Sequence, residues 1–342
     1  MLVLEDGSLF TGASVGAQGF AFGEAVFTTS MSGYQETVTD PSYAGQIVCF
    51  TAPMIGNYGI APERSQSSRI HATGVVMREA RGPHWTDWLH ERGIVALTGV
   101  DTRSLVLHLR EQGAMRAAVV ADETALDEVV AAVRAQPPMT GMALVAGVSP
   151  HERYTFAAEG AVRVAVVDYG IKRSILQLLG RHGAAVDVFP HDVDADTLVT
   201  YHGVVLGNGP GDPAPLVEET ATVRELLGRV PVLGVCLGHQ LLALATGHET
   251  FKLPFGHRGA NHPVLDHRTR RVLVTSQNHG FAVAASAGDQ VSHTSLYDGT
   301  VEGLSFPDLR AQSSQFHPEA SPGPHDGASI IGEWVEELKQ AA

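Results

Sequence analysis

Short apolar stretches alternate with helix-like segments through the second half of the chain, and this alternation limits the possible folds more than any other feature. Strands are expected at residues 163–168, 184–189, 203–208 and 231–235. Helices are expected at residues 171–183, 219–228 and 237–247. Such an alternation predicts an α/β fold with an open, mostly parallel sheet flanked by helices. Binding sites of these folds lie at the carboxyl ends of the strands.

The first half of the chain mixes strand and helix signals less regularly. Residues 46–53 read as a buried strand, and Asp6-Gly7 marks a hairpin turn. Prolines and glycines cluster near residues 137–160, which is typical of loops. We therefore expect three parts: a mixed β/α N-terminal domain at residues 1–150, a linker at residues 151–162 and an α/β domain at residues 163–342.

The charge balance and the cysteine count argue against several classes of protein. The net charge is −14 and no basic run offsets it, so we expect no nucleic-acid partner. No stretch reaches the roughly 18 apolar residues of a membrane span, and the N-terminus turns acidic at Glu5, unlike a signal peptide. Cys49 and Cys236 are too few for a disulfide framework. We therefore expect a cytoplasmic protein with reduced thiols and no membrane association.

The strongest local motif is Gly234-Val235-Cys236-Leu237-Gly238, between an expected strand and an expected helix. Glycines on both sides of a nucleophile at such a junction are typical of a nucleophile elbow, because the sharp turn needs small neighbours. Cys236 would then lie at a helix N-terminus, where the helix dipole favours the thiolate. The N–H of Leu237 would face an oxyanion formed on the attacked carbon. A buried cysteine in an ordinary turn is the alternative, but the paired glycines favour the nucleophile.

The segment Gln315-Phe316-His317-Pro318-Glu319 contains a candidate base and an acid to orient it. Residues two apart in an extended segment project to the same side, so Glu319 could hold the ring of His317 while that ring deprotonates a cysteine. Taken alone, the segment could equally be a surface loop. His-x-Glu also resembles a zinc deaminase signature, but the Pro-Cys-x-x-Cys partner and His-Glu-x-x-His are both absent from the sequence. We therefore expect no metal site.

Two further segments combine glycine with polar residues. Glycines at residues 207–211 end an expected strand and allow close backbone approach, so this loop could supply a second oxyanion donor and substrate contacts. It is not a Walker A loop, because Gly-x-x-x-x-Gly-Lys-Ser/Thr occurs nowhere in the sequence. Residues 276–281 carry an amide, a glycine and an aromatic ring that could line a polar pocket. Either segment, taken alone, could be an ordinary turn.

Together, these motifs resemble a known family. GVCLGHQLLA, followed by HPE at residues 317–319, resembles the class I (triad-type) glutamine amidotransferases. LGNGPGDPAP, PFGHRGANHPV, SQNHGFAV and HPEASPGPHD resemble the small, glutamine-hydrolysing subunits of carbamoyl phosphate synthetases. LEDGSLFTG, FTTSMSGYQETVTDPSYAGQIV and GVDTRSLVLHLREQGAMRAAV resemble that family's own N-terminal domain, which other amidotransferases lack. The resemblance covers nearly the whole chain and implies a class I glutamine amidotransferase domain at residues 163–342.

The resemblance also implies roles for residues that match the family motifs. It implies a catalytic triad of Cys236, His317 and Glu319. It implies that L-glutamine is contacted by Ser42, Gly209, Gly211, Leu237, Gln240, Asn278, Gly280 and Phe281. It implies no cofactor in this chain, with ATP and magnesium in a large partner subunit of a heterodimer or higher assembly. Ammonia would pass to that subunit, which makes carbamoyl phosphate from bicarbonate for arginine and pyrimidine synthesis.

Three other functions stay open. An amidotransferase subunit that serves a different acceptor would keep the triad, although the N-terminal motifs argue against it. In an esterase-like hydrolase with a cysteine elbow the acid precedes the histidine in the chain, whereas Glu319 follows His317. A non-catalytic scaffold would not require Cys236, His317 and Glu319 together.

Overall fold

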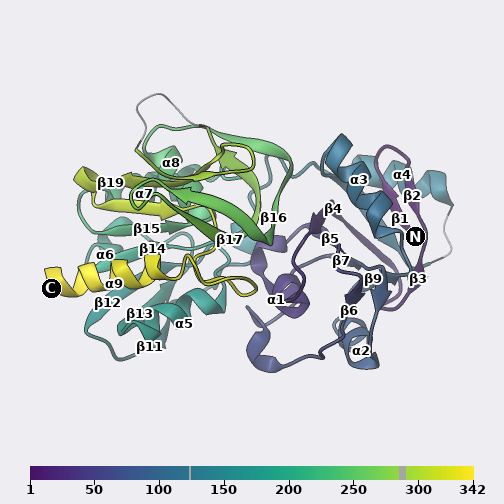
Figure 1. The fold of residues 1–342 in the computed structure, drawn as a ribbon, viewed down its shortest axis with the longest axis horizontal. Helices are drawn as coiled ribbons and strands as arrows, with labels where there is room; N and C mark the ends of the chain where they lie inside the picture. Colours follow the sequence, from purple (N-terminus) through teal and green to yellow (C-terminus); the bar gives the residue numbers. More distant parts are fainter. Residues whose placement is uncertain (123–124, 285–289) are drawn as a thin grey trace. The chain divides into compact units, whose positions relative to one another are not determined.

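The chain divides into two compact units, which Figure 1 shows as a ribbon coloured along the sequence. The computed structural model describes residues 1–122, 125–284 and 290–342. The first unit comprises Met1–Met142 and Pro254–Arg258, and the second comprises Ala143–Leu253 and Gly259–Ala342. Within the described ranges, no helix combines the length and the apolar character that crossing a bilayer requires.

The first unit is built on a mixed sheet. Its strands, in spatial order, are β2 (Leu9–Phe10), β1 (Leu2–Leu4), β10 (Met115–Val120), β4 (Phe20–Thr28), β5 (Gln46–Phe50), β7 (Gly74–Val76), β9 (Val95–Thr98) and β3 (Ala13–Ser14). β4, β5, β7 and β9 run parallel, and the other strands pair antiparallel. A separate parallel pair joins β6 (Met54–Ile55) and β8 (Glu79–Ala80). β1 and β2 form the hairpin predicted at Asp6-Gly7.

Helices cover both faces of this sheet because alternate residues of a strand point to opposite sides. The helices of the unit are α1 (Tyr34–Thr39), η1 (Pro41–Tyr43), η2 (Pro62–Arg64), α2 (Pro83–Glu91), α3 (Thr102–Gln112) and α4 (Leu126–Ala135). Cys49 of β5 lies in a core cluster with Leu105 of α3. Its neighbour Val48 lies in another cluster, with Val38 of α1 and Trp85 of α2. Burial raises the pKa of the Cys49 thiol to about 12, so this cysteine is the inert core residue that its apolar strand predicts.

The second unit contains the predicted open sheet. Its strands, in spatial order, are β11 (Tyr154–Ala157), β13 (Ala184–Phe189), β12 (Val162–Val167), β14 (Gly203–Leu206), β15 (Val232–Val235), β20 (Ala311–Ser314), β19 (Val301–Phe306), β17 (Arg271–Val283), β16 (Thr250–Asp266) and β18 (Val291–Ser295). The central strands β13, β12, β14, β15 and β20 are parallel. β11, β18 and β19 pair antiparallel. The parallel centre confirms the predicted α/β class.

The helices of the second unit pack on the two faces of the central strands (Figure 1). They are η3 (Val145–Gly147), α5 (Arg173–Arg181), α6 (Ala195–Leu198), α7 (Val217–Leu226), α8 (Leu237–Ala245), η4 (Pro307–Leu309) and α9 (Ser329–Ala341). Val167 of β12 lies in one core with Leu241 of α8. The preceding residue, Val166, lies in the other core with Ile175 of α5 and Trp334 of α9. The sheet therefore brings the carboxyl ends of its parallel strands to one edge, between two helical layers.

The region between the two expected domains differs from the sequence-based expectation. Residues 151–162, expected to be a linker, contain β11, which pairs antiparallel with β13. Asp187 of β13 fixes this strand, because its carboxylate accepts a hydrogen bond from Thr155 at 2.6 Å and pairs with Arg153 at 2.9 Å. Residues 143–150 are grouped with the second unit, because Val145 packs in that unit's core. The proline and glycine cluster near residues 137–160 includes the passage between the units at Met142, but it gave no sign of the strand β11.

Candidate active site

Cys236 is positioned by a sharp turn between β15 and α8. It is the N-cap residue of α8, and its φ of 54° is a conformation that non-glycine residues rarely adopt. The turn requires both flanking glycines. A Cβ on Gly234 would lie 2.6 Å from the carbonyl oxygen of Gly238, and a Cβ on Gly238 would lie 2.2 Å from the carbonyl oxygen of Leu206. The strand, the strained residue and the helix together form the predicted nucleophile elbow.

Hydrogen bonds tie the elbow to the surrounding strands. The N–H of Cys236 donates to the carbonyl oxygen of Ser314 in β20 at 2.9 Å. The N–H of Gly238 donates to the carbonyl oxygen of Gly207, just after β14, at 3.0 Å. The thiol of Cys236 is buried and donates to the carbonyl oxygen of Asn278 at 3.7 Å. The elbow is therefore tied to β20, to β17 and to the residue that follows β14.

The candidate base and its partner lie just after β20. The N–H of His317 donates to the carbonyl oxygen of Ser276 in β17 at 2.9 Å. Nδ1 of His317 lies 2.8 Å from Oε1 of Glu319, and the two side chains are 1% and 0% exposed. A turn brings them together, because the N–H of Ala320 donates to the carbonyl oxygen of His317. We expected an extended segment, but Pro318 has no N–H with which to continue a strand ladder.

The charges of this pair are set by burial and by each other. Burial lowers the pKa of His317, but the negative charge of Glu319 and the contact with Cys236 together outweigh it and raise the pKa above its ordinary value. Burial raises the pKa of Glu319, but the positive charges of Lys172 and His317 hold it well below its ordinary value. The carboxylate therefore stays ionised and favours the protonated ring. A protonated imidazole next to a nucleophile can donate its proton to a leaving group.

Lys172 is a member of this cluster that the sequence pattern did not reveal. Its Nζ lies 2.7 Å from Oε1 of Glu319, and its side chain is 3% exposed. It is the N-cap residue of α5, shortly after the end of β12. The one sequence feature that could have indicated Lys172 as a site residue was its position near the carboxyl end of a parallel strand, which it shares with Cys236. The apolar stripe of the following helix, at Ile171 and Ile175, gave no reason to expect a buried charge.

The glycine loop lies against the elbow. A Cβ on Gly209 would lie 2.3 Å from the carbonyl oxygen of Tyr169 and 2.8 Å from Cδ2 of Leu237, so only glycine fits there. Gly211 has a φ of 91°, which favours glycine as well. Leu237 begins α8, so its N–H has no partner within the helix. The glycine loop therefore packs against the start of α8, and its role as an oxyanion donor stays a prediction.

Four of the predicted glutamine contacts lie on β17 and in the first turn of α8. Asn278, Gly280 and Phe281 belong to β17, and Gln240 lies in the first turn of α8. Nε2 of Gln240 donates to the carbonyl oxygen of Phe281 at 2.9 Å and to Oε1 of Gln315 at 3.1 Å. Together with the bond from the cysteine thiol to Asn278, these contacts hold the strand against the helix. The structure therefore brings Asn278 and Gln240 into contact with Cys236 and Phe281 into contact with Gln240, and the contacts of all four residues with glutamine stay predictions.

Ser42 is the one predicted glutamine contact in the first unit. It lies in η1 and is buried, with 8% of its surface exposed. Its N–H donates to Oδ1 of Asp40, the N-cap residue of η1, at 2.9 Å. This local capping bond explains its backbone position, and its contact with glutamine stays a prediction.

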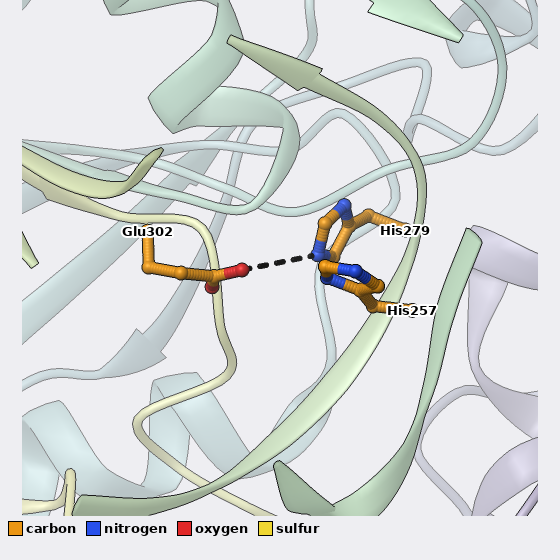
Figure 2. A group of neighbouring side chains, drawn as sticks. All are labelled: His257, His279 and Glu302. Atoms are coloured by element: carbon orange, nitrogen blue, oxygen red, sulfur yellow. Dashed lines mark ion pairs between the residues drawn. The ribbon is translucent and has the colours of Figure 1, made fainter. Parts of the chain in front are cut away.

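A buried polar network surrounds His279, the β17 residue between Asn278 and Gly280. Figure 2 shows the pair of His279 and Glu302, whose Nε2 and Oε1 atoms are 3.9 Å apart with side chains 2% and 0% exposed. Gln277 joins them: its Oε1 accepts a hydrogen bond from Nε2 of His279 at 3.0 Å, and its Nε2 donates to Oε2 of Glu302 at 2.7 Å. Figure 2 also draws His257, which is grouped with the first unit. The network fixes the backbone around Asn278; that the chain binds no metal stays a prediction.

Comparisons with known proteins cover nearly the whole chain. The family model "Carbamoyl-phosphate synthase small chain, CPSase domain" matches residues 2–119, and "Glutamine amidotransferase class-I" matches residues 165–336. The carbamoyl phosphate synthase small chain of Chlorobaculum tepidum is 44% identical over 99% of this chain and 98% of its own length. The chain belongs to the carbamoyl phosphate synthase small chain family.

Other members of the family align over their full lengths as well. The carbamoyl phosphate synthase small chain of Methanopyrus kandleri is 46% identical over 98% of this chain and 97% of its own length. That of Xanthomonas campestris is 42% identical over 100% of this chain and 98% of its own length. The carbamoyl phosphate synthase small chain family thus accounts for both halves of the chain, the mixed β/α half and the half that carries Cys236.

Proposed function

We propose that this chain hydrolyses glutamine and delivers the ammonia to the large chain of a glutamine-hydrolysing carbamoyl phosphate synthase. One observation supports this most directly: Cys236, His317 and Glu319 lie together, buried, within the part of the chain that matches the class I glutamine amidotransferases. Membership of the small chain family then selects carbamoyl phosphate synthesis among the reactions that such a domain serves.

The first half of the reaction breaks the amide bond of glutamine. The sulfur of Cys236 attacks the side-chain amide carbon, and the carbonyl oxygen becomes an oxyanion. The N–H of Leu237 and the loop at Gly209 would hold that oxyanion, since both adjoin the elbow. His317 gives its proton to the departing nitrogen, so ammonia leaves and a glutamyl thioester remains on the sulfur.

The second half of the reaction frees the enzyme. Neutral His317 takes a proton from water, whose oxygen attacks the thioester carbon. The carbon–sulfur bond breaks and glutamate leaves. The proton taken from water stays on His317, and the sulfur of Cys236 is free again. Glu319 keeps the ring in one orientation and stabilises its protonated form throughout, as its 2.8 Å contact with Nδ1 allows. The sum is glutamine and water giving glutamate and ammonia.

We assign the remaining chemistry to the partner. ATP and magnesium belong to the large chain in this proposal, which makes carbamoyl phosphate from bicarbonate there for arginine and pyrimidine synthesis. This chain needs no cofactor for thioester chemistry, because a thiolate and an imidazole suffice. The first unit is assigned to docking on the large chain, by analogy within the family alone. The assembly is placed in the cytoplasm, where both thiols stay reduced.

The other functions are less well supported. An amidotransferase subunit that serves a different synthetase would match the class I amidotransferase model. It would not match the small chain model that covers residues 2–119 here. In a cysteine-elbow hydrolase the acid precedes the histidine in the chain. Here the acid that contacts His317 is Glu319, which follows the histidine by two residues. Neither alternative accounts for the full-length similarity to carbamoyl phosphate synthase small chains.

Replacing the nucleophile tests the proposal. In a complex of this chain with its large chain, Cys236→Ser should abolish carbamoyl phosphate synthesis from glutamine, because a serine hydroxyl is not ionised at neutral pH. Synthesis from added ammonium chloride should stay at the wild-type rate, because the cysteine acts only in releasing ammonia. Both rates are measured with the same preparation. An equal fall of the two rates would show that the proposed division of labour is wrong.

A further inference from the structure

We propose that Gln315 is a positioning residue for substrate binding, whose side-chain amide fixes the orientation of the Gln240 amide beside the nucleophile. The inference rests on the proposed function, because it assigns the Gln240 amide a contact with glutamine. Nε2 of Gln240 donates to Oε1 of Gln315 at 3.1 Å and to the carbonyl oxygen of Phe281 at 2.9 Å. Gln315 therefore acts on the substrate through Gln240.

The backbone holds both amides next to the nucleophile. The N–H of Gln240 donates to the carbonyl oxygen of Cys236 at 3.2 Å, within the first turn of α8. Gln315 directly follows Ser314, whose carbonyl oxygen accepts from the N–H of Cys236 at 2.9 Å. The N–H of Gln315 donates to the carbonyl oxygen of Glu302 at 2.8 Å. Gln240 and Gln315 are 3% and 0% exposed, so both amides have fixed positions away from bulk water.

The donor hydrogens decide which way the Gln240 amide points. The carbonyl oxygen of Phe281 can only accept, so the NH₂ group of Gln240 must face it. The second hydrogen of that NH₂ group is accepted by Oε1 of Gln315. With both hydrogens used inside the chain, the carbonyl oxygen of Gln240 is the group left for a ligand. That oxygen favours a hydrogen-bond donor of glutamine, either the α-ammonium or the carboxamide.

An unpaired atom of Gln315 agrees with this assignment. Nε2 of Gln315 is buried without a hydrogen-bond partner among the described residues. If this amide were turned around, its NH₂ group would face the NH₂ group of Gln240, which offers no acceptor. A buried donor without a partner is destabilising, and such a group in a folded protein calls for an explanation. The orientation of Gln240 supplies that explanation, because it requires the oxygen of Gln315 on the side that faces Gln240.

The first test compares Gln315→Met with Gln312→Met in the complex with the large chain. Methionine has a similar shape but offers Gln240 no oxygen. Gln315→Met should raise KM for glutamine by about fivefold or more, the fold-change expected for one hydrogen bond of typical strength. Its kcat should stay within about twofold, because the triad is unchanged.

Gln312 is the matched control, since it is a partly exposed glutamine of the same strand, β20. It lines a surface pocket with Ser292 and Glu337. Gln312→Met should therefore leave both kinetic constants unchanged. A Gln315→Met enzyme with unchanged KM would overturn the proposal. So would a lower kcat without a change in KM, because Gln315 would then act on the neighbouring triad.

Gln315→Glu tests whether the acceptor oxygen is what matters. It keeps an oxygen for Gln240 and removes the unpaired NH₂ group. Burial raises the pKa of the introduced carboxyl, and the carbonyl oxygen of a protonated carboxyl still accepts. KM for glutamine should therefore stay within about twofold of the wild-type value. A KM as high as that of Gln315→Met, in a protein with the wild-type urea midpoint, would overturn the proposal.

A double variant separates positioning from a general structural role. If Gln315 acts through Gln240, then Gln315→Met added to Gln240→Ala should change KM by less than about twofold, because the amide that it orients is already absent. The double variant leaves neither amide without its partner, so the test stays open if Gln315→Met alone does not fold. Multiplicative effects on KM would overturn the proposal.

Inhibition by L-glutamate identifies the donor that Gln240 recognises, because glutamate has the α-ammonium but no carboxamide. If Gln315→Met weakens glutamate inhibition as much as it raises KM, the donor is the ammonium group. If inhibition is unchanged while KM rises, the donor is the carboxamide, and either result supports the role of Gln315. A wild-type complex without glutaminase activity would overturn the proposed function as well. An active wild type with a normal KM in Gln315→Met overturns only the role of Gln315.

Discussion

At the scale of single residues, environment separates two chemically identical thiols. Cys49 lies within an apolar strand, and burial raises its pKa to about 12, so it stays protonated at any physiological pH. Cys236 is equally buried but lies at the start of α8, with a carbonyl oxygen and the imidazole of His317 as neighbours. The difference between an inert and a nucleophilic cysteine is therefore made by what surrounds each sulfur.

Glu319→Gln provides the prediction at this scale. The substitution keeps the shape of the side chain and removes its charge, so the ring of His317 loses the group that favours its protonated form. We expect kcat for glutamine to fall by ~10²-fold or more with KM little changed, because the carboxylate helps the transition state more than the bound substrate.

His317→Asn is the comparison for that prediction. Its loss should be at least as large, because the base itself is gone. The losses of the two single variants should not add in the double variant, since the residues act as one unit. Steady-state kinetics of the three proteins measure this. A Glu319→Gln enzyme with wild-type turnover, or fully additive losses, would contradict the triad.

At the scale of elements, the active site depends on how closely α8 approaches β14. Gly238 lies in the first turn of α8, and its N–H bonds to Gly207 at the end of β14. No side chain fits at that point, because the carbonyl oxygen of Leu206 would be 2.2 Å from a Cβ. The position of Cys236 at the start of α8 therefore depends on close backbone contact between α8 and the end of β14.

Gly238→Ala should push the helix away from the strand. We expect a loss of roughly 1–3 kcal/mol in unfolding free energy, as for overpacked cores, and a large fall in glutaminase activity because the elbow moves with the helix. Gly180→Ala is the matched control: it also lies in a helix, α5, and its Cβ would be 3.7 Å from that of Ala157, an ordinary contact.

That control should keep its activity and lose no stability, because alanine favours a helix over glycine by roughly 1 kcal/mol. Urea unfolding and glutamate release measure both variants. A Gly238→Ala protein with wild-type stability and turnover would show that the elbow tolerates a side chain, and that the close approach is not required.

At the scale of the whole molecule, the site exists only when the second unit is folded. Lys172 comes from the beginning of that unit, Cys236 from its middle, and His317 and Glu319 from near its end. Folding brings their charges out of water, so protonation and folding of this unit are linked. The pH dependence of stability therefore reports on the charge state of the site without any substrate.

His317→Asn makes this linkage measurable. Burial lowers the pKa of His317, but Glu319 and Cys236 together outweigh it, so the folded pKa lies above the ordinary 6.5. A group with a raised folded pKa stabilises fully below its unfolded pKa and loses that contribution as pH rises through the folded pKa. The difference in unfolding free energy between wild type and His317→Asn should therefore be largest between about pH 5 and 6.5 and shrink at higher pH. Urea titrations from about pH 5 up to the folded pKa of about 10 measure it, and a difference that grows with pH would mean a neutral ring in the folded chain.

The sequence by itself determined the features that depend on near neighbours in the chain. Apolar runs of strand length between helical stripes specified the parallel centre of the second unit, because burial and backbone preference act over a few residues. Gly234 and Gly238 around Cys236 predicted the elbow. The demand on Gly234 is local, because its Cβ would meet the carbonyl oxygen of Gly238, whereas the demand on Gly238 comes from Leu206 in β14. His317 and Glu319 were close enough in sequence for their pairing to be predicted, although a turn rather than an extended strand joins them.

Only the tertiary structure decided which distant residues meet. Nothing near Lys172 in the sequence indicates that its ammonium group lies 2.7 Å from Glu319, because that contact depends on where β12 and β20 lie in the sheet. The pairing of β11 with β13 and the network of His279 with Glu302 were likewise not predicted. Strand order is set by the packing of the whole unit. A buried charged residue and its partner can therefore lie far apart in the sequence, and no local pattern predicts that they pair.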